Sequence, residues 1–322
     1  MSSAKQDLGH QLLEHGYVVV DNLIDDATIG RVRDEIHEVV DGIARGMHAE
    51  GLIPKSWTEK GFDRQLACIV EHDVAMATEL VKRLHGTRGE GGHIGPAIFD
   101  LVSYATLLDS IETIVGPEII GSSVYRIRPK APGLVRGVVP WHQDSGYLLK
   151  HCDRELIVTC WIPLVDSSEA NGCLHVLPDA HRQGILTHST GGSGNYLEIK
   201  DQNLPGKCKP VPVPVQRGSV LFMTNLTPHS SYANNTDAVR WSVDFRYQSS
   251  EVPNNVGKTP ADFDPSSPEV EIACFPPEAD FVLRSPKHPE KVVRTWQGLN
   301  KIREDYFARR AGMAEFPFRW TA

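Results

Sequence analysis

The first third of the chain carries apolar residues at helical spacing. Between residues 26 and 46 they recur every three or four positions, and Asp25 or Asp26 can cap the helix that this pattern predicts. The same reasoning predicts helices over 5–16, 73–85 and 96–115, with a short strand over 17–21. We therefore expect residues 1–117 to form a helical cover that includes the first strand.

The pattern changes near residue 118, where short apolar runs split by Pro, Gly, Asn and Asp replace the helical spacing. Strands are predicted over 119–128, 136–141, 155–164, 173–177, 210–214, 219–223 and 239–247. Short strands joined by loops without intervening helices favour a sandwich or a barrel. The polar, glycine-rich segment 184–209 is longer than most loops, which indicates a lid or a binding loop.

The remaining chain adds a Pro- and Asp-rich stretch after residue 250 and a predicted helix over 287–311. The glycine-rich stretch 86–95 is expected to be a surface loop between two helices. The sequence shows no internal repeat and no clear linker. We therefore expect a single domain over residues 1–322, made of the helical cover, a β-rich core over 118–247 and a C-terminal extension over 248–322.

The composition excludes several function classes. Of 322 residues, 40% are hydrophobic and 23% charged, as in ordinary soluble globular proteins. A net charge of −8 without a Lys/Arg block gives no indication of nucleic-acid binding. Six cysteines without a CxxC pair favour reduced thiols over disulfides or a zinc site. Apolar runs are too short for a membrane span or a secretory signal, so we expect a cytoplasmic location.

A metal-binding pattern follows one of the predicted strands. In His142-Gln-Asp144 the two outer side chains share one strand face, and a further histidine, His229, follows the strand over 219–223. Two imidazoles and one carboxylate leave three positions of an octahedral ion open, which is typical of Fe(II) oxygenases. We therefore predict that His142, Asp144 and His229 bind one Fe(II).

The same short pattern occurs elsewhere in the chain. His151-Cys-Asp153 has the same spacing, and His48-Ala-Glu50 follows the end of a predicted helix. An isolated pattern of this kind is weak evidence for a metal site. The segment at 142–144 is favoured because it closes a strand and because His229 lies at a suitable distance downstream, whereas His151 lies in a polar stretch that indicates a solvated turn.

Eleven residues after His229, Arg240 opens a strand with two different faces. Arg240, Ser242, Asp244 and Arg246 lie on one face, and aromatic or apolar residues lie on the other. If the polar face lines a cavity, Arg240 needs an anion, and a bidentate pair with a dicarboxylic cosubstrate would supply one. The other end of such a 2-oxo acid can chelate iron. The alternative is a solvent-exposed Arg240 paired with a neighbouring acid.

Four segments together resemble the phytanoyl-CoA dioxygenase family of Fe(II)/2-oxoglutarate oxygenases. They are His15–Ile24, Trp141–Asp144, Trp161 with Asn171–His181, and Arg217–Arg240. The resemblance implies an α+β fold with a mainly β core: a double-stranded β-helix (jelly-roll, cupin-like) with covering N-terminal and C-terminal helices. It also implies Fe(II) as cofactor, with 2-oxoglutarate and O2 as cosubstrates.

By matching position, the resemblance assigns each site residue an expected role. His142, Asp144 and His229 would be the metal ligands, and Arg240 would pair with the distal carboxylate of 2-oxoglutarate. Ser231 and Trp161 match positions that line the cosubstrate pocket in similar enzymes. Halogenating relatives replace the carboxylate ligand with a small residue, so the presence of Asp144 favours hydroxylation. His175 is expected not to be a ligand.

The substrate is expected to be a small molecule bound over the iron. Tyr147, which follows the metal-binding segment, and Arg126 and Arg128, which share a strand face with Lys130, are candidate lining residues. These arginines suggest an anionic substrate, and the alternative is that they are surface residues. The loop 184–209 and the C-terminal extension do not fit the acyl-CoA enzyme, so the family name does not identify the substrate.

We expect an enzyme that hydroxylates its substrate and releases succinate and CO2. One alternative is a cupin-like metal protein that does not use 2-oxoglutarate. The other is a sensor or binding module that has kept the barrel without catalysis. The sequence makes no prediction about the oligomeric state.

Overall fold

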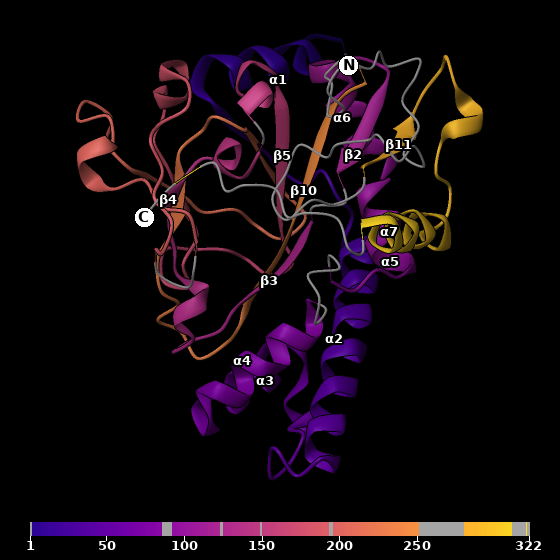
Figure 1. Cartoon of the computed structure of the whole chain (residues 1–322), viewed down its shortest axis with the longest axis vertical. Helices are drawn as coiled ribbons and strands as arrows, with labels where there is room; N and C mark the ends of the chain where they lie inside the picture. Colours follow the sequence, from indigo (N-terminus) through magenta and orange to yellow (C-terminus); the bar gives the residue numbers. More distant parts are fainter. Residues whose placement is uncertain are drawn as a thin grey trace.

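A computed structural model describes residues 2–85, 92–122, 125–148, 150–192, 196–250, 280–310 and 320. Two antiparallel sheets form its centre, and helices cover the outside of the larger one (Figure 1). This is the double-stranded β-helix with covering helices that the family resemblance implies. None of the helices in the described ranges is both long and apolar enough to cross a membrane.

The larger sheet has seven strands, in the order β1-β8-β5-β10-β2-β11, with β3 also paired to β10. The bounds are β1 Tyr17–Val20, β2 Ile119–Ser122, β3 Arg126–Lys130, β5 Ile157–Pro163, β8 Val220–Thr224, β10 Arg240–Ser249 and β11 Asp280–Arg284. The smaller sheet has the order β4-β9-β6-β7. Its strands are β4 Val139–His142, β6 Leu174–Val176, β7 Val211–Val213 and β9 His229–Ser231.

Six of the described helices lie before strand β2 in the sequence. They are α1 Ser2–His15, α2 Asp26–Ala49, α3 Gly61–His72, α4 Val74–Leu84, α5 Pro96–Val102 and α6 Ala105–Val115, and α7 Trp296–Arg310 follows the barrel. The side chain of Asp25 accepts the backbone N–H of Thr28 and caps α2, as the sequence predicts. Helix α2 runs away from the sheets with α3 and α4 beside it (Figure 1).

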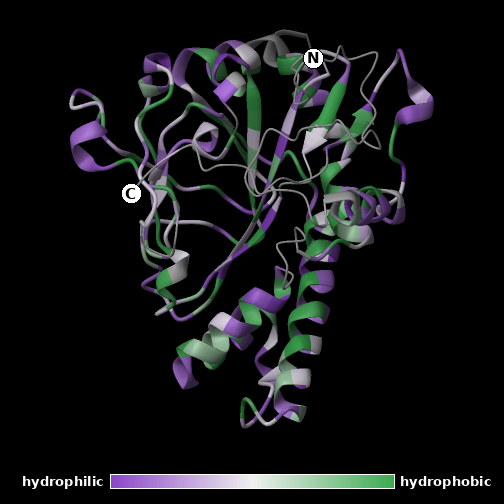
Figure 2. Ribbon diagram, in the orientation of Figure 1, coloured by the Kyte–Doolittle hydropathy of each residue, from purple (hydrophilic) through white to green (hydrophobic). Residues whose placement is uncertain are grey.

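Strand β10 is buried on both faces, so its apolar and its polar side chains both lie in the interior of the protein. Trp241, Val243, Phe245 and Tyr247 are at most 1% exposed and pack into the core shared with the helices. The central strands and the inner faces of the helices therefore form the apolar interior of Figure 2. The opposite, polar face of β10 is also buried, because it points into the barrel.

Several element boundaries differ from the sequence prediction. The helix expected over 96–115 is two helices, since the backbone leaves the helical conformation at Tyr104. The strand expected over 119–128 is β2 and β3, which pair with opposite ends of β10. The helix expected from residue 287 begins at Trp296, after a 3-10 turn over Pro289–Lys291.

Three elements were not predicted. Helix α3 was missed although Phe62, Leu66 and Ile69 recur at helical spacing and are buried. Strand β9 has no apolar residue, and β11 lies within the region expected to be an extension. Of the predicted surface loop 86–95, residues 86–91 lie outside the described ranges.

Candidate active site

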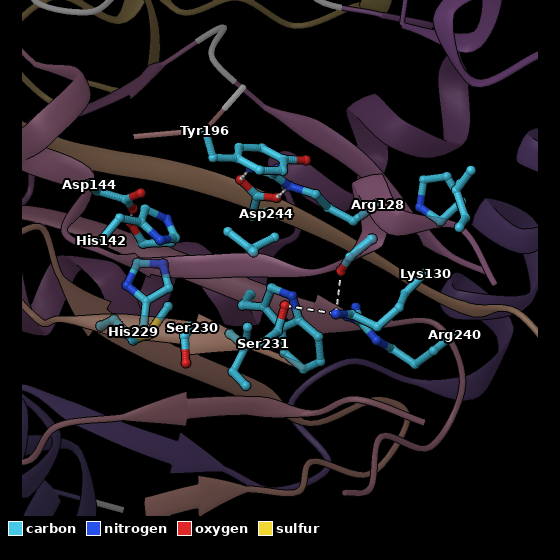
Figure 3. Close-up of a pocket in the computed structure, with 18 of the residues that line it drawn as sticks. Arg128, Lys130, His142, Asp144, Tyr196, His229, Ser230, Ser231, Arg240 and Asp244 are labelled. Carbon is cyan, nitrogen blue, oxygen red and sulfur yellow. Dashed lines mark hydrogen bonds and ion pairs between the residues drawn. The ribbon is translucent and has the colours of Figure 1, made fainter. Parts of the chain in front are cut away.

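Two histidines and one aspartate meet at one end of the smaller sheet. His142 is the last residue of β4, His229 is the first residue of β9, and the two residues are paired across the strands. Asp144 lies two positions after His142, and one ligand atom from each side chain lies within 4.8 Å of the others (Figure 3). Among the described residues, these three form the one His, Cys, Asp or Glu group with the spacing of a metal site.

Backbone carbonyls orient both imidazoles. Nδ1 of His142 donates to the carbonyl of Pro140 at 2.9 Å, and Nδ1 of His229 donates to that of Thr227 at 2.9 Å. With Nδ1 protonated in each ring, Nε2 keeps its lone pair and is the nitrogen available to a metal. Burial, and after it the neighbouring imidazole of His229, lowers the pKa of His142 well below its usual value, so His142 is neutral, as a metal ligand requires.

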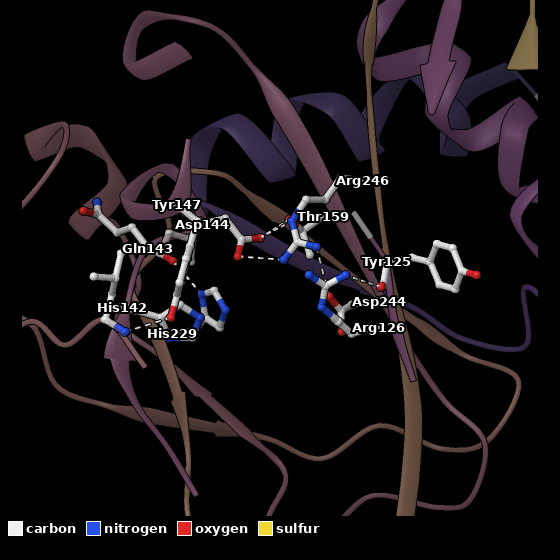
Figure 4. Close-up of polar contacts among 12 residues, drawn as sticks. Tyr125, Arg126, His142, Gln143, Asp144, Tyr147, Thr159, His229, Asp244 and Arg246 are labelled. Atoms are coloured by element: carbon white, nitrogen blue, oxygen red, sulfur yellow. Dashed lines mark hydrogen bonds and ion pairs between the residues drawn. The ribbon is translucent and has the colours of Figure 1, made fainter. Parts of the chain in front are cut away.

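Asp144 is held by a buried ion network. Arg246 donates to both of its oxygens, from Nη2 to Oδ1 at 2.9 Å and from Nε to Oδ2 at 3.2 Å, and Thr159 donates its hydroxyl to Oδ2. Burial alone would raise the pKa of Asp144, but Arg246 and His229 lower it below its usual value. Asp144 is therefore a carboxylate at any physiological pH, with its orientation fixed (Figure 4).

The sequence prediction did not include Arg246 or Thr159. The signal that would have found Arg246 is the polar face of β10, where it shares strand parity with Arg240. Thr159 carries no comparable signal, because it lies within the continuously buried strand β5.

The other two candidate metal patterns are used differently. His48 pairs through Nδ1 with the carbonyl of Ile53, and Glu50 forms an ion pair with Arg83 at 2.9 Å. Asp153 is not part of a metal-spaced group in the described ranges. His175, which we expected not to be a ligand, packs its ring edgewise against Tyr232 at 4.5 Å between ring centroids.

The loop that begins at residue 184 packs against the metal-binding segment. The amide nitrogen of Gln143 donates to the carbonyls of Gly184 at 2.9 Å and Leu226 at 2.6 Å, and its oxygen accepts the backbone N–H of Leu186 at 2.7 Å. The backbone N–H of Gln143 donates to Nε2 of His188 at 3.0 Å. Gln143 is fully buried, and its hydrogen bonds to Gly184 and Leu186 hold the start of the loop against the segment between His142 and Asp144.

Replacing Gln143 with leucine is expected to lower the free energy of unfolding by about 3 kcal/mol, because three partly buried backbone groups lose their partners. Urea denaturation of the metal-free protein measures this. Gln143→Glu is the matched variant: it keeps an acceptor for Leu186 but places a buried carboxylate against the two carbonyls, so it should be less stable than the leucine variant. A loss below about 1 kcal/mol for leucine would show that this side chain does not hold the loop.

At the other end of the barrel face, Arg240 is buried and lacks an acid. Arg240 is 3% exposed. Its guanidinium donates to the hydroxyl of Ser242 at 2.6 Å and to the carbonyl of Gly172 at 3.3 Å. The guanidinium carbon lies 5.1 Å from the centre of the Trp161 ring. Nε has no hydrogen-bond partner. Burial and the charge of Arg128 lower the pKa of Arg240 to about 9, so the group stays protonated at neutral pH.

Lys130 is a second buried basic group, beside Arg240. It is paired with Arg240 across β3 and β10, is 3% exposed, and donates to the hydroxyl of Ser231 at 2.8 Å and to the carbonyls of Gly137 and Tyr232. Burial, then Arg240, lowers its pKa to about 6. In the described ranges no carboxylate pairs with Lys130 or Arg240, so the structure leaves an unmet requirement for an anion here.

An open cavity joins the metal-binding residues to this cationic end. Trp161, Ser231 and Arg240 line it, as do Arg128 and Tyr196. Arg126 and Tyr147, the other two candidate substrate residues, are not among its lining residues.

Tyr147 lies close to the metal-binding residues even so. Its ring packs edgewise on His142 at 5.9 Å between centroids, and its hydroxyl accepts the backbone N–H of Leu197 at 2.9 Å. Through this contact Tyr147 positions the loop that carries Tyr196.

The donor set fits iron, and the buried cation Arg240 with the basic Lys130 beside it fits a dicarboxylate. Two neutral imidazoles and one carboxylate leave half of an octahedral ion open, and the anion that Arg240 and Lys130 require would lie in the same cavity. A double-stranded β-helix with this site defines a non-haem iron oxygenase that uses 2-oxoglutarate. The sequence profile of the phytanoyl-CoA dioxygenase (PhyH) family matches residues 12–242, and the chain belongs to that family.

Individual relatives are distant but cover most of the chain. It is 24% identical over 257 residues to a phytanoyl-CoA dioxygenase domain-containing protein 1 homolog of Caenorhabditis briggsae, covering 73% of this chain and 87% of the relative. It is 23% identical over 247 residues to the human peroxisomal phytanoyl-CoA dioxygenase, covering 74% and 66%. An apo structure of the non-heme monooxygenase ThoJ superposes with a TM-score of 0.54 at 18% identity, covering 95% and 96%, which supports the fold.

Proposed function

We propose that this oxygenase hydroxylates a small-molecule substrate, with conversion of 2-oxoglutarate and O2 to succinate and CO2. The observation that carries the proposal is the buried cation Arg240, with the basic side chain of Lys130 beside it and no acid paired to either in the described ranges, in the same cavity as a complete ligand set. Asp144 as third ligand favours hydroxylation over halogenation, because the carboxylate occupies the position that a halide would need.

Different residues of the cavity would bind the metal and the cosubstrate. His142, Asp144 and His229 would hold the iron, which activates O2 when bound. Arg240 would bind the distal carboxylate of 2-oxoglutarate, with Lys130 and the hydroxyl of Ser231 on the same group. Trp161 would form the wall under Arg240, and Arg246 would keep Asp144 in one orientation.

The experiment that tests the proposal combines a spectrum with a product assay. Anaerobic Fe(II) and 2-oxoglutarate together should give a visible metal-to-ligand charge-transfer band, and O2 with a substrate should then release succinate. A cupin-like protein that does not use 2-oxoglutarate would give no band that depends on it. A sensor would give the band but no substrate-stimulated succinate or O2 consumption.

The binding of 2-oxoglutarate is expected to take up a proton. The pKa of Lys130 is about 6 in the free protein, so the amine is neutral at pH 7.5, and a bound carboxylate would raise that pKa. Affinity should therefore be greatest below pH 6 and fall by up to about tenfold per pH unit above it, until the pH reaches the raised pKa.

Calorimetry of the metal-loaded protein in two buffers with different ionisation enthalpies measures this uptake. Lys130→Met is the control, and it should bind 2-oxoglutarate without proton uptake. Equal apparent enthalpies in both buffers for the unsubstituted protein would contradict the role of Lys130.

A further inference from the structure

A third polar region of the cavity is distinct from both the metal-binding residues and the cationic end. It contains Arg128 of β3, Asp244 of β10 and Tyr196 of the loop that begins at residue 184 (Figure 3). Nε of Arg128 donates to Asp244 at 2.7 Å and Nη2 donates to it at 3.3 Å. The third nitrogen, Nη1, has no hydrogen-bond partner in the described part of the chain, and the side chain is 32% exposed although it lines the cavity.

Asp244 holds this guanidinium in a fixed position. Its carboxylate also accepts Nη1 of Arg246 at 3.0 Å, and Arg246 directs its other two nitrogens to Asp144. The network therefore runs from Asp144 through Arg246 and Asp244 to Arg128; Figure 4 shows the first three members, and Figure 3 shows Asp244 with Arg128. Because Arg246 is occupied on all three nitrogens, Arg128 is the member of the network that can still bind an anion in the cavity.

The charges of this network do not balance once a metal is bound. Asp144 then shares its negative charge with the ion, which leaves Asp244 opposite two guanidinium groups. All three of these groups lie inside the barrel, and Asp244 is 3% exposed. An excess positive charge that faces a cavity attracts an anion, and the attraction is stronger where the cavity walls exclude part of the water. One further negative charge at Nη1 of Arg128 would balance this excess.

Part of the cavity wall is apolar. Val81 of α4, Leu134 and Val139 line the same cavity, and the first two are at most 6% exposed. Cavities that bind small molecules combine such walls with a few placed polar groups. Asp244 and Arg246 lie two positions apart on β10, roughly 6.6 Å at 3.3 Å per residue, so the guanidinium of Arg128 lies within a small molecule's length of the metal-binding residues.

We propose that Arg128 binds a carboxylate of the substrate, so that the substrate is a small acid with an apolar body. A single free guanidinium edge and a single excess charge match a monocarboxylate better than a dianion. Tyr196 lies beside Arg128 and covers the bound group from the loop side. This inference rests on the proposed function, because the acid would occupy the space that 2-oxoglutarate leaves.

The test uses the full chain with Fe(II) and saturating 2-oxoglutarate under anaerobic conditions. The probes are straight-chain monocarboxylates from butanoate to dodecanoate and their primary amides, which keep the shape and lose the charge. Binding is followed by calorimetry and by perturbation of the charge-transfer band. Arg128→Gln and Arg128→Lys are compared with Arg126→Gln, the same substitution two positions earlier on β3 at a residue that does not line the cavity.

The best acid should bind at least about tenfold more tightly than its amide, as expected for a hydrogen-bonded charge. Arg128→Gln should remove this preference, Arg128→Lys should keep part of it, and Arg126→Gln should behave like the unsubstituted protein. The affinity for 2-oxoglutarate should change by less than about threefold in all three variants, since Arg240 and Lys130 are intact.

Three results would overturn the inference: no acid of any length binds, acid and amide bind equally, or Arg128→Gln leaves the acid's affinity unchanged. If Arg128→Gln does not fold, the inference is still tested by the acid–amide comparison in the unsubstituted protein and by the Arg128→Lys variant. A normal charge-transfer band with no preference for acids refutes this inference alone. Absence of the band from the unsubstituted protein refutes the proposed function, and the inference fails with it.

Discussion

Replacing Asp144 with alanine is expected to abolish the charge-transfer band and to weaken Fe(II) binding by more than about 100-fold. Loss of a residue that merely supports a metal ligand already costs about 10–100-fold in affinity, and Asp144 is itself a ligand. It is also the one ligand that offsets part of the metal's charge. The band and anaerobic Fe(II) titration measure the effect, and His229→Ala should have the same outcome.

The chain contains a matched control for this substitution. Asp153 follows His151 with the same spacing, so Asp153→Ala removes the carboxylate of the competing pattern, and it should leave both the band and the iron affinity unchanged. The opposite result, with the band lost in Asp153→Ala and kept in Asp144→Ala, would place the metal at the other pattern.

Asp144→Ala also leaves Arg246 with one acid in place of two, so the variant's stability has to be measured separately. Removing one partner of a buried ion pair costs about 3–5 kcal/mol. Thr159→Val is a milder variant, because it removes one hydrogen bond to Asp144 and keeps the ion pair. A folded Thr159→Val protein with iron affinity reduced by up to about tenfold would separate positioning of the ligand from stability of the barrel.

The metal ligands could be predicted from the sequence because two of them are close in the chain. His142 and Asp144 share one face by strand parity, which requires no knowledge of the partner strands. The third ligand depends on the pairing of β4 with β9, and β9 carries no apolar residue that would mark it as a strand. His229 was found through its distance from the other two and through the family resemblance.

The polar face of β10 shows the limit of reasoning from one strand. Its alternation is visible in the sequence, yet the same alternation would suit a strand with one face in water. The structure resolves this, because Arg240, Ser242 and Asp244 are at most 3% exposed. Burial of the second face depends on the smaller sheet closing over it, and that long-range arrangement leaves no mark on residues 240–247 themselves.

The cationic end could be predicted only in part for the same reason. Arg240 was expected to bind the cosubstrate, whereas Lys130 was grouped with Arg126 and Arg128 as candidate substrate lining. The register of β3 against β10 separates them: Lys130 lies opposite Arg240, and Arg128 lies opposite Ser242. Register between strands more than a hundred residues apart is set by tertiary packing, so strand parity identified the shared face but not the two different subsites.

Replacing Arg240 with alanine is expected to weaken 2-oxoglutarate binding by at least about 30-fold while leaving Fe(II) affinity nearly unchanged. Breaking a buried charged pair in a binding site costs about 2–5 kcal/mol, and about 1.4 kcal/mol corresponds to tenfold. Lysine at this position keeps the charge but loses the bidentate geometry and the contact with Trp161, so Arg240→Lys should recover a part of the affinity.

The titration of the charge-transfer band with 2-oxoglutarate measures this affinity, and Arg217→Ala serves as control. Arg217 is 42% exposed and pairs with Asp26 at the surface, so its loss should leave the titration unchanged. An unchanged titration in Arg240→Ala would show that the cosubstrate's distal carboxylate binds elsewhere. If Arg240→Ala keeps its metal-dependent turnover and no succinate is released, the protein is a cupin-like barrel that does not use 2-oxoglutarate. Arg240 would then be a buried cation that binds no reactant.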